Sequence, residues 1–331
     1  MQQVINLILE SGESGIELAL YVIVPIMVVM MGIMKLLEDA GILNRIAGFI
    51  APVLRVFGLP GLGVFAILQC LLISFAAPVA TVKLMDRDKY ITGPNIAATL
   101  AAVFTISQAN ATFPLAVEGL NLPVVFATSI AGGLLSGLIA HKISKKYYTR
   151  GKAEANDQDH SLTGQEGENE SAAGGQGPGQ ASGGRLNVFK SLLGGAEEGF
   201  WIGVKAAPIL IFSLFVVNIL RVTSAIELLE TLLTPLLTQV NIPGIAVLPI
   251  VTKFLAGGTA MMGITMDLMR EGSLTALQLN RIAGLGIHAI DPVAISLYAA
   301  IGLKVGRQIK PALMGASVGI GIRTVLHLLL F

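Results

Sequence analysis

The strongest constraint on the fold of this chain is a set of long stretches without any ionisable side chain. Four of them lie between Glu17 and Lys35, Arg55 and Lys83, Lys89 and Glu118, and Glu118 and His141. Each reaches or approaches the roughly 20 apolar residues that a helix needs to cross a bilayer. The sequence therefore predicts an all-α polytopic membrane protein, with the lipid bilayer as its first partner.

The composition argues against the soluble alternative. Hydrophobic residues make up 53% of the chain and charged residues 13%, with a mean hydropathy of +0.75. A soluble domain carries about 25% charged residues, so helices buried in a large soluble core would have too little polar surface to cover them. The net charge of +1 predicts no nucleic-acid partner. A single cysteine, Cys70, excludes a disulfide framework and a metal cluster built from thiolates.

The chain repeats itself at an offset of 183 positions. The matched residues are Pro25 and Pro208, Pro52 and Pro235, Leu54 and Leu237, Pro60-Gly61 and Pro243-Gly244, Ala77 and Ala260, Arg87 and Arg270, and Thr92 and Thr275. Proline fixes φ and removes a backbone donor, so it marks where a helix begins or is kinked. Three proline matches at one offset predict an internal duplication.

A polar segment separates the two copies. From Gly151 to Arg185 the only large apolar residue is Leu162, so this stretch cannot bury enough surface to offset its ordering entropy. We expect a first repeat over residues 1–150, a disordered polar cytoplasmic linker over 151–190, and a second repeat over 191–331.

Each repeat contains the same predicted parts in the same order. They are a span with a proline (Leu18–Met34; Ala206–Leu220), an amphipathic interfacial helix (Ile42–Phe57; Ile226–Val240), a broken apolar segment (Gly61–Val82; Gly244–Met266), and two further helices (Ile96–Val117 and Val124–Ala140; Asn280–Leu303 and Ala312–Leu330).

The distribution of Lys and Arg favours inverted repeats. The basic segment His141–Lys152 is predicted to be cytoplasmic, and the N-terminus, without Lys or Arg, to lie outside. The other loops agree only if each broken segment is re-entrant, which leaves three crossings per repeat. Four positive charges then fall outside, namely Arg221, Arg270, Arg281 and Arg323. Four crossings per half with parallel repeats is the competing model. The expected location is the cell (inner) membrane.

The broken segments are the first candidates for a binding site. Transporters with inverted repeats place their sites at broken helices, where free backbone groups can hold a solute. The first segment contributes Ser74, and the second contributes Gly257, Gly258 and Thr259. The alternative is that these small residues only allow helices to pack closely.

The helix after each broken segment carries polar residues within an apolar span. In the first repeat they are Gln108, Asn110 and Thr112, and in the second His288 and Asp291. The last two, three positions apart, are predicted to share a helix face, and an ionisable residue inside a span indicates function by default. The alternatives are a structural His–Asp pair and, for Gln108 and Asn110, hydrogen bonding between helices.

Asp291 is the strongest single candidate. It precedes Pro292, which has no backbone N–H, so the carbonyl of His288 is predicted to lose its helical partner. A carboxylate beside an open carbonyl would suit a coupling Na⁺ or H⁺, or a solute hydroxyl. No other cofactor and no metal site are expected.

An enzyme is not expected. Ser74, His288 and Asp291 could be imagined as a catalytic triad, but the sequence has no nucleophile elbow and no metal-ligand spacing. His141 and His327 lie near span ends and are predicted to be interfacial.

These motifs resemble a known family. Leu59-Pro60-Gly61, the broken segment that follows, and SQANATFP over Ser107–Pro114 are similar to the nucleoside-recognition, or Gate, domain family. That family includes the spore-maturation A and B membrane proteins, and related domains form the core of concentrative nucleoside transporters and of ferrous iron permeases. The resemblance covers residues 16–143 and 199–330. It implies a re-entrant hairpin in each repeat and a polar site between the hairpin tips and the next helices.

The predicted function is that of a transporter or permease for a small polar solute, with a nucleoside-like solute as one candidate. A homo-oligomer is compatible with this prediction. Two alternatives remain open, a non-transporting scaffold or maturation factor that acts through a partner, and a metal-ion permease.

Overall fold

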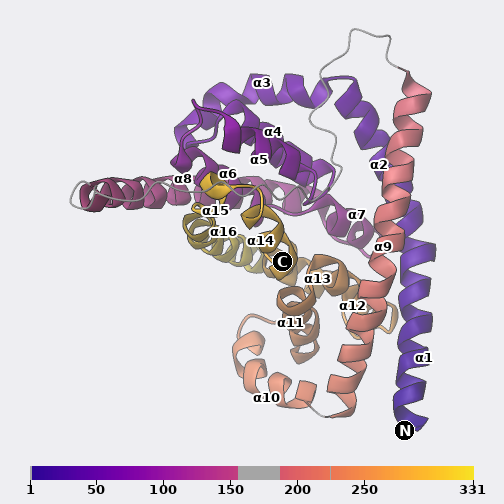
Figure 1. Cartoon of the computed structure of the whole chain (residues 1–331). Coiled ribbons are helices and arrows are strands. Elements are labelled where there is room, and N and C mark those ends of the chain that lie inside the picture. Colours follow the sequence, from indigo (N-terminus) through magenta and orange to yellow (C-terminus); the bar gives the residue numbers. More distant parts are fainter. Residues whose placement is uncertain (1, 156–186, 224) are drawn as a thin grey trace, which may run out of the picture.

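The computed structural model describes residues 2–155, 187–223 and 225–331, and its regular elements over these residues are all helices (Figure 1). Most of the predicted linker lies outside the described residues. Helices α8 (Leu122–Ala155) and α9 (Val188–Val222) extend into its two ends. The predicted all-α class is confirmed.

Two long helical rods stand side by side along one edge of the molecule (Figure 1). The first is continuous over α1 (Gln2–Glu17), the π-helical turn η1 (Leu18–Ile23) and α2 (Val24–Asp39). The second is α9, which runs antiparallel to it. Both rods are longer than the spans predicted for this position in each repeat.

Glycines bring these two rods into backbone contact. A Cβ atom on Gly195 would lie 2.3 Å from the carbonyl oxygen of Met31, and one on Gly199 would lie 2.3 Å from that of Met27. No side chain fits at these distances. In lipid, where the hydrophobic effect does not drive helices together, such close packing of small residues stabilises a helix pair.

The remaining helices follow the same order in both halves, except that the short α15 has no counterpart in the first half. In the first half they are α3 (Ile42–Leu54), η2 (Arg55–Phe57), α4 (Gly61–Leu72), α5 (Pro78–Arg87), α6 (Gly93–Thr105), α7 (Ala109–Val117) and α8; in the second they are α10 (Ala225–Thr238), η3 (Gly244–Ala246), α11 (Val247–Ala256), α12 (Gly258–Arg270), α13 (Ala276–Gly286), α14 (Pro292–Ala299), α15 (Leu303–Gly306) and α16 (Ile309–Leu330). Helices α3 and α10, α6 and α13, and α7 and α14 begin 183 positions apart, the offset of the sequence repeat.

The two amphipathic helices lie at opposite ends of the molecule, α3 at the top and α10 at the bottom of Figure 1. The segment Ile42–Phe57 is bent by 109° relative to α4. Apolar side chains remain exposed on both helices, among them Phe49 on α3 and Leu232 on α10. This placement suits helices that lie in the two interfaces of a bilayer.

Corresponding helices of the two halves run antiparallel. For α8 and α16, Thr128 meets His327 near one end and Ser144 meets Gln308 near the other. Helices α2 and α9, which carry the matched Pro25 and Pro208, are also antiparallel. A two-fold axis in the membrane plane requires this arrangement. The side of the membrane that each loop faces stays a prediction.

Five helices of the described residues are long and apolar enough to cross a membrane: Val4–Asp39, Gly93–Val117, Leu122–Tyr147, Val188–Val216 and Ile309–Leu330. They coincide with five of the six predicted crossings. The sixth, formed by α13 and α14, is divided by a non-helical stretch into pieces of 11 and 8 residues.

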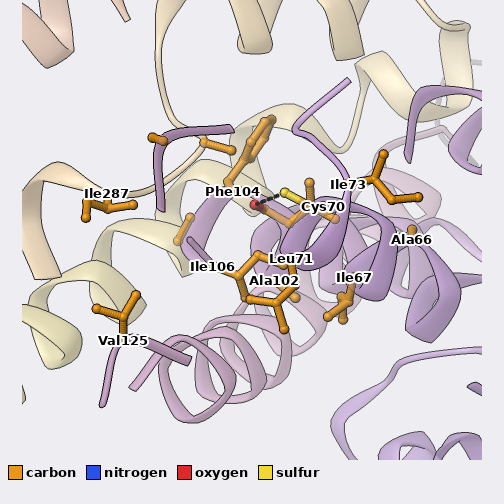
Figure 2. Close-up of a cluster of buried hydrophobic side chains, with 14 of the residues drawn as sticks. Ala66, Ile67, Cys70, Leu71, Ile73, Ala102, Phe104, Ile106, Val125 and Ile287 are labelled. Atoms are coloured by element: carbon orange, nitrogen blue, oxygen red, sulfur yellow. Dashed lines mark hydrogen bonds between the residues drawn. The ribbon is translucent and has the colours of Figure 1, made fainter. Parts of the chain in front are cut away.

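Both broken segments fold as pairs of packed helices, here called hairpin 1 (α4 and α5) and hairpin 2 (α11 and α12). Hairpin 1 packs its apolar face on α6, where Cys70, Leu71 and Phe104 belong to one buried cluster (Figure 2). The Sγ atom of Cys70 donates to the carbonyl of Val103 over 3.8 Å. The face of hairpin 1 that carries Cys70 thus lies in an apolar interior.

Candidate functional site

The polar residues predicted from the sequence lie at two breaks in the helices after the hairpins. The first break, residues 106–108, separates α6 from α7, and the second, residues 287–291, separates α13 from α14. The backbone N–H of Ala289 donates to the carbonyl of Phe104 over 3.1 Å. The two breaks therefore lie side by side, although they are far apart in the sequence.

The predicted helix face shared by His288 and Asp291 is wrong. Asp291 is extended, with φ −154° and ψ 167°, because the α conformation is disfavoured before a proline. It caps α14 instead, since its Oδ1 accepts from the N–H of Ala294 over 2.8 Å. The Nδ1 atom of His288 accepts from the N–H of Ile290 over 3.1 Å, so the two side chains have separate local partners.

The predicted open carbonyl at His288 is also wrong. Its oxygen accepts a hydrogen bond from Nε2 of Gln108 over 3.3 Å. Gln108 is the residue before the first turn of α7, but its side chain makes no capping hydrogen bond and instead bridges the first break to the second. A prediction limited to one helix could not include this partner, which is 180 positions away.

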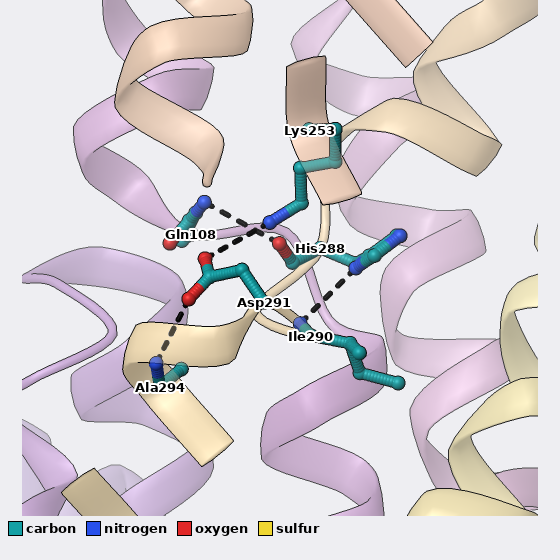
Figure 3. A network of polar contacts seen from close by, with 6 residues as sticks. All are labelled: Gln108, Lys253, His288, Ile290, Asp291 and Ala294. Atoms are coloured by element: carbon teal, nitrogen blue, oxygen red, sulfur yellow. Dashed lines mark hydrogen bonds and ion pairs between the residues drawn. The ribbon is translucent and has the colours of Figure 1, made fainter. Parts of the chain in front are cut away.

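An ion pair, which the sequence analysis did not predict, occupies the centre of the site. Nζ of Lys253, on α11, lies 3.1 Å from Oδ2 of Asp291, and the two side chains are 0% and 5% exposed (Figure 3). A lysine inside the apolar run PIVTKFLAGG was the available signal, because a charge within such a segment requires a partner. The pair joins hairpin 2 to the second break.

The tip of hairpin 2 touches both breaks. Gly257, between α11 and α12, has φ +93°, a left-handed conformation that favours glycine. A Cβ atom on Gly258 would lie 1.9 Å from Nε2 of Gln108 and 3.6 Å from Nζ of Lys253, and one on Gly257 would lie 3.3 Å from Oδ2 of Asp291. A larger residue at position 258 would therefore displace the side-chain amide of Gln108.

A buried arginine holds the two breaks together from the other side. Nη1 of Arg323, on α16, donates to the carbonyls of Ile287, over 2.9 Å, and Thr105. These carbonyls stand at the C-terminal ends of α13 and α6, where the helix dipole favours a positive charge. The inclusion of Arg323 among the positive charges that fall outside does not hold, because its side chain is fully buried inside the protein.

The other predicted residues play different parts. Oγ of Ser74, at the tip of hairpin 1, accepts from the N–H of Ala77 over 3.3 Å, and Thr112 donates to the carbonyl of Gln108 over 2.8 Å. Asn110 is buried, and Thr259 is partly buried. The structure thus gathers Gln108, Gly257, Gly258, His288 and Asp291, while Ser74 and Thr112 make local bonds.

The tip of hairpin 1 is joined to the second repeat by a different contact. The hydroxyl of Tyr298, on α14, donates to the carbonyl of Phe75 over 2.7 Å. Tyr298 also packs edge-on against Phe104, with ring centroids 5.5 Å apart. Each hairpin tip therefore contacts elements of the opposite repeat.

Several polar atoms near the breaks have no partner among the described residues. They are Oε1 of Gln108, Oδ1 of Asn110 and Nε2 of His288, all of them buried. Buried polar atoms are normally hydrogen-bonded, and leaving one unpaired costs about 1–3 kcal/mol. These atoms give the site unused capacity to donate and accept hydrogen bonds.

The predicted interfacial position of His327 is wrong. Its ring is buried and lies 2.9 Å from Oγ1 of Thr128 and 2.6 Å from the carbonyl of Asn280. It therefore joins α16 to α8 and α13 inside the protein. His141 is partly buried, and its Nδ1 has no partner among the described residues.

Comparisons with known proteins bear on the fold that holds these residues. The family model described as nucleoside recognition, the Gate domain, matches residues 20–123. A structure of CNTnw, a concentrative nucleoside transporter, in an outward-facing state covers 99% of this chain and 83% of its own, with a TM-score of 0.64 and 14% identity. This chain has the same fold.

Two other states of CNTnw match as well. An inward-facing substrate-bound structure has a TM-score of 0.61 and 13% identity, and covers 99% of this chain and 81% of its own. A structure in an intermediate state has a TM-score of 0.59 and 15% identity, and covers 100% of this chain and 86% of its own. No curated protein matches the chain. The resemblance to Gate domains and to the core of concentrative nucleoside transporters is confirmed, and the chain is a multi-pass membrane protein of that fold.

Proposed function

We propose that this protein is a permease that binds a small, neutral, nucleoside-like solute between the tip of hairpin 2 and the two helix breaks. One observation carries the proposal. Buried hydrogen-bonding atoms of Gln108 and His288 have no partner in the described parts of the chain, at the point where three non-helical segments meet. Binding sites for small molecules combine apolar walls with a few converging polar groups of this kind.

The chemistry of these atoms fits a nucleoside-like solute. Oε1 of Gln108 can accept from a hydroxyl or an amino group. Because Nδ1 of His288 accepts from the N–H of Ile290, the neutral ring carries its proton on Nε2, which can donate to a solute. The ring of Phe254 lies 5.6 Å from that of His288, so an aromatic surface adjoins the polar atoms. A solute with hydroxyls and a heteroaromatic ring would use both. The Gate match over residues 20–123 supports this class.

The fold supports transport over a purely structural role. CNTnw has been captured in outward-facing, intermediate and inward-facing states with the fold of this chain. The polar contacts of the hairpins described above, such as the Lys253–Asp291 ion pair and the Tyr298–Phe75 hydrogen bond, can be exchanged for others when a hairpin moves. We infer that the protein resides in the cell membrane and carries its solute across it.

The test combines binding with uptake. Purified protein is heated in the presence of nucleosides, nucleobases, amino acids and divalent metals, and the stabilising compounds are assayed for uptake into proteoliposomes. A nucleoside should raise the unfolding temperature in proportion to the logarithm of its concentration above Kd. Gln108→Leu and His288→Phe should remove this response, while Ser317→Ala, on an exposed face of α16, should retain it.

The remaining outcomes separate the alternatives. Stabilisation by a divalent metal alone would favour a metal-ion permease. Nucleoside binding without uptake would favour a factor that acts through a partner. A folded protein that responds to no compound of the panel would contradict the proposed site.

A further inference from the structure

The ion pair between Lys253 and Asp291 is the most unusual feature of the site, because both charges are removed from solvent. The Nζ–Oδ2 distance is 3.1 Å, with side-chain exposures of 0% and 5%. Taking two charges out of water is expensive, so hydrophobic side chains of similar size often stabilise a protein equally well. The pair is therefore poorly explained by stability alone.

The ammonium of Lys253 lies where a free cation would bind. Asp291 supplies a carboxylate to this position, which also faces the tip of hairpin 2 and the Gln108 side chain (Figure 3). The two carboxylate oxygens are both engaged, Oδ1 by the N–H of Ala294 and Oδ2 by Lys253. A sodium ion would have to displace the lysine to reach Oδ2.

The repeat shows that the two charges form a unit. At the offset of 183, Lys253 corresponds to Cys70 and Asp291 corresponds to Gln108. Both members are neutral in the first repeat, and both are charged in the second. A site evolved only to hold an external cation would need the carboxylate without the lysine. The paired change indicates a carboxylate built together with its own counter-ion.

We propose that Lys253 is a tethered cation that permanently fills the cation seat of Asp291, so that this site takes no Na⁺ from solution. The seat is then electrically neutral, and the nearby Oε1 of Gln108 and Nε2 of His288, which have no partner among the described residues, serve a solute alone. Binding of the solute would be independent of Na⁺. Only this last consequence rests on the proposed function, because occupancy of the seat can be measured without any solute.

The experiment removes the tether and supplies the cation from solution. Wild-type protein, Lys253→Ala and Lys253→Met are heated in chloride salts of Na⁺, K⁺, methylammonium or N-methylglucamine at equal ionic strength. Wild-type protein should unfold at the same temperature in all four. Lys253→Ala leaves a cavity beside an unpaired carboxylate, so methylammonium should raise its unfolding temperature by on the order of 5 °C over N-methylglucamine. Na⁺ and K⁺ should give smaller increases.

Two controls define the seat. Lys253→Met fills the cavity with a neutral chain and should respond less than Lys253→Ala. The double variant Lys253→Ala with Asp291→Asn lacks the carboxylate and should lose the response. If Lys253→Ala cannot be purified, Lys253→Ser carries the same comparison, because its hydroxyl can donate to Asp291 and still leave room.

Two results would overturn the proposal. One is a wild-type protein that Na⁺ stabilises over N-methylglucamine, since its seat would then be open. The other is a Lys253→Ala protein that responds to the cations no more than the double variant does. A wild-type protein without any solute response, but with the expected cation pattern in its variants, would contradict the proposed function and leave the tethered cation standing.

Discussion

The two halves of the molecule share a helical frame but differ in what lies at its centre. At the position in the hairpin where the first half has Cys70, the second has Lys253, and at the helix break Gln108 corresponds to Asp291. The thiol donates weakly to a backbone carbonyl inside an apolar cluster, whereas the lysine forms a buried ion pair. The same arrangement of helices therefore accommodates a neutral pair of side chains in one half and a charged pair in the other.

The asymmetry also separates two roles. The first repeat offers a neutral amide that reaches across to the second break, and the second repeat carries the charges of the site. Gln108 therefore adds hydrogen-bonding capacity to a site whose electrostatics are set by the other half. A duplicated chain can in this way obtain an unsymmetrical site from two copies of a single unit.

The largest expected effect follows from removing one charge of the pair. Asp291→Asn keeps a capping side chain for α14 but leaves Lys253 buried without a counter-ion, which should destabilise the protein by about 3–5 kcal/mol. Thermal unfolding of the purified protein measures this. The double variant Asp291→Asn with Lys253→Met should recover most of the loss. A double variant as unstable as the single one would show that the two charges act separately.

The next effect concerns the arginine that bridges the halves. Arg323→Met removes the donor to the carbonyls of Thr105 and Ile287, and each buried carbonyl left without a donor costs about 1–3 kcal/mol. We expect a lower unfolding temperature and weaker solute binding, because the breaks lose their fixed spacing. Arg323→Lys keeps one donor and should fall between the two. Equal stability of Arg323→Met and wild type would contradict the claim that Arg323 stabilises the two breaks.

The matching substitution in the first repeat should have a smaller effect. Cys70→Ala removes a buried sulfur atom and one weak hydrogen bond, and should destabilise the protein by about 1 kcal/mol. Lys253→Ala, at the equivalent position, leaves a carboxylate unpaired and should lose several times more. Comparison of their unfolding temperatures in the absence of added methylammonium tests the contrast between the halves directly. Similar losses at the two positions would contradict it.

The smallest effect is expected for a deletion in the segment that connects the two halves. Deletion of 161–180, which lies outside the described residues and was chosen for its polar composition, should leave folding and uptake unchanged. Closure entropy depends weakly on length, so shortening a flexible connection changes stability by only about 0.6 kcal/mol for each halving. The amount of membrane-inserted protein and its unfolding temperature are the measurements. Loss of inserted protein would assign the linker a structural or binding role.

Much of the frame could be predicted from the sequence because its signals are local. Prolines and charge-free runs fixed where helices begin and break, and the offset of 183 related the halves. Gln108 and Asp291 were found because polar residues inside apolar spans stand out. The predicted shared helix face of His288 and Asp291 was wrong because Pro292 sets the local backbone, which the assumption of a continuous helix ignored.

The contacts that complete the site could not be predicted, since they join distant segments. Lys253 reaches Asp291 across 38 positions, and Arg323 reaches Thr105 across 218. Both cations stand in apolar runs, a signal that was present but was used for topology in the case of Arg323. A positive charge buried inside the protein says nothing about which side of the membrane its segment faces.

The antiparallel contacts between α2 and α9 and between α8 and α16 join the two halves of the chain as an interface joins two subunits. Since synthesis runs from the N-terminus, the first half is made before Gly195 and Gly199, the residues that pack against the backbone at Met31 and Met27. Lipid must cover these surfaces until translation of the second half is complete. The two halves therefore complete their folding together, and a substitution that disrupts one half also removes packing from the other.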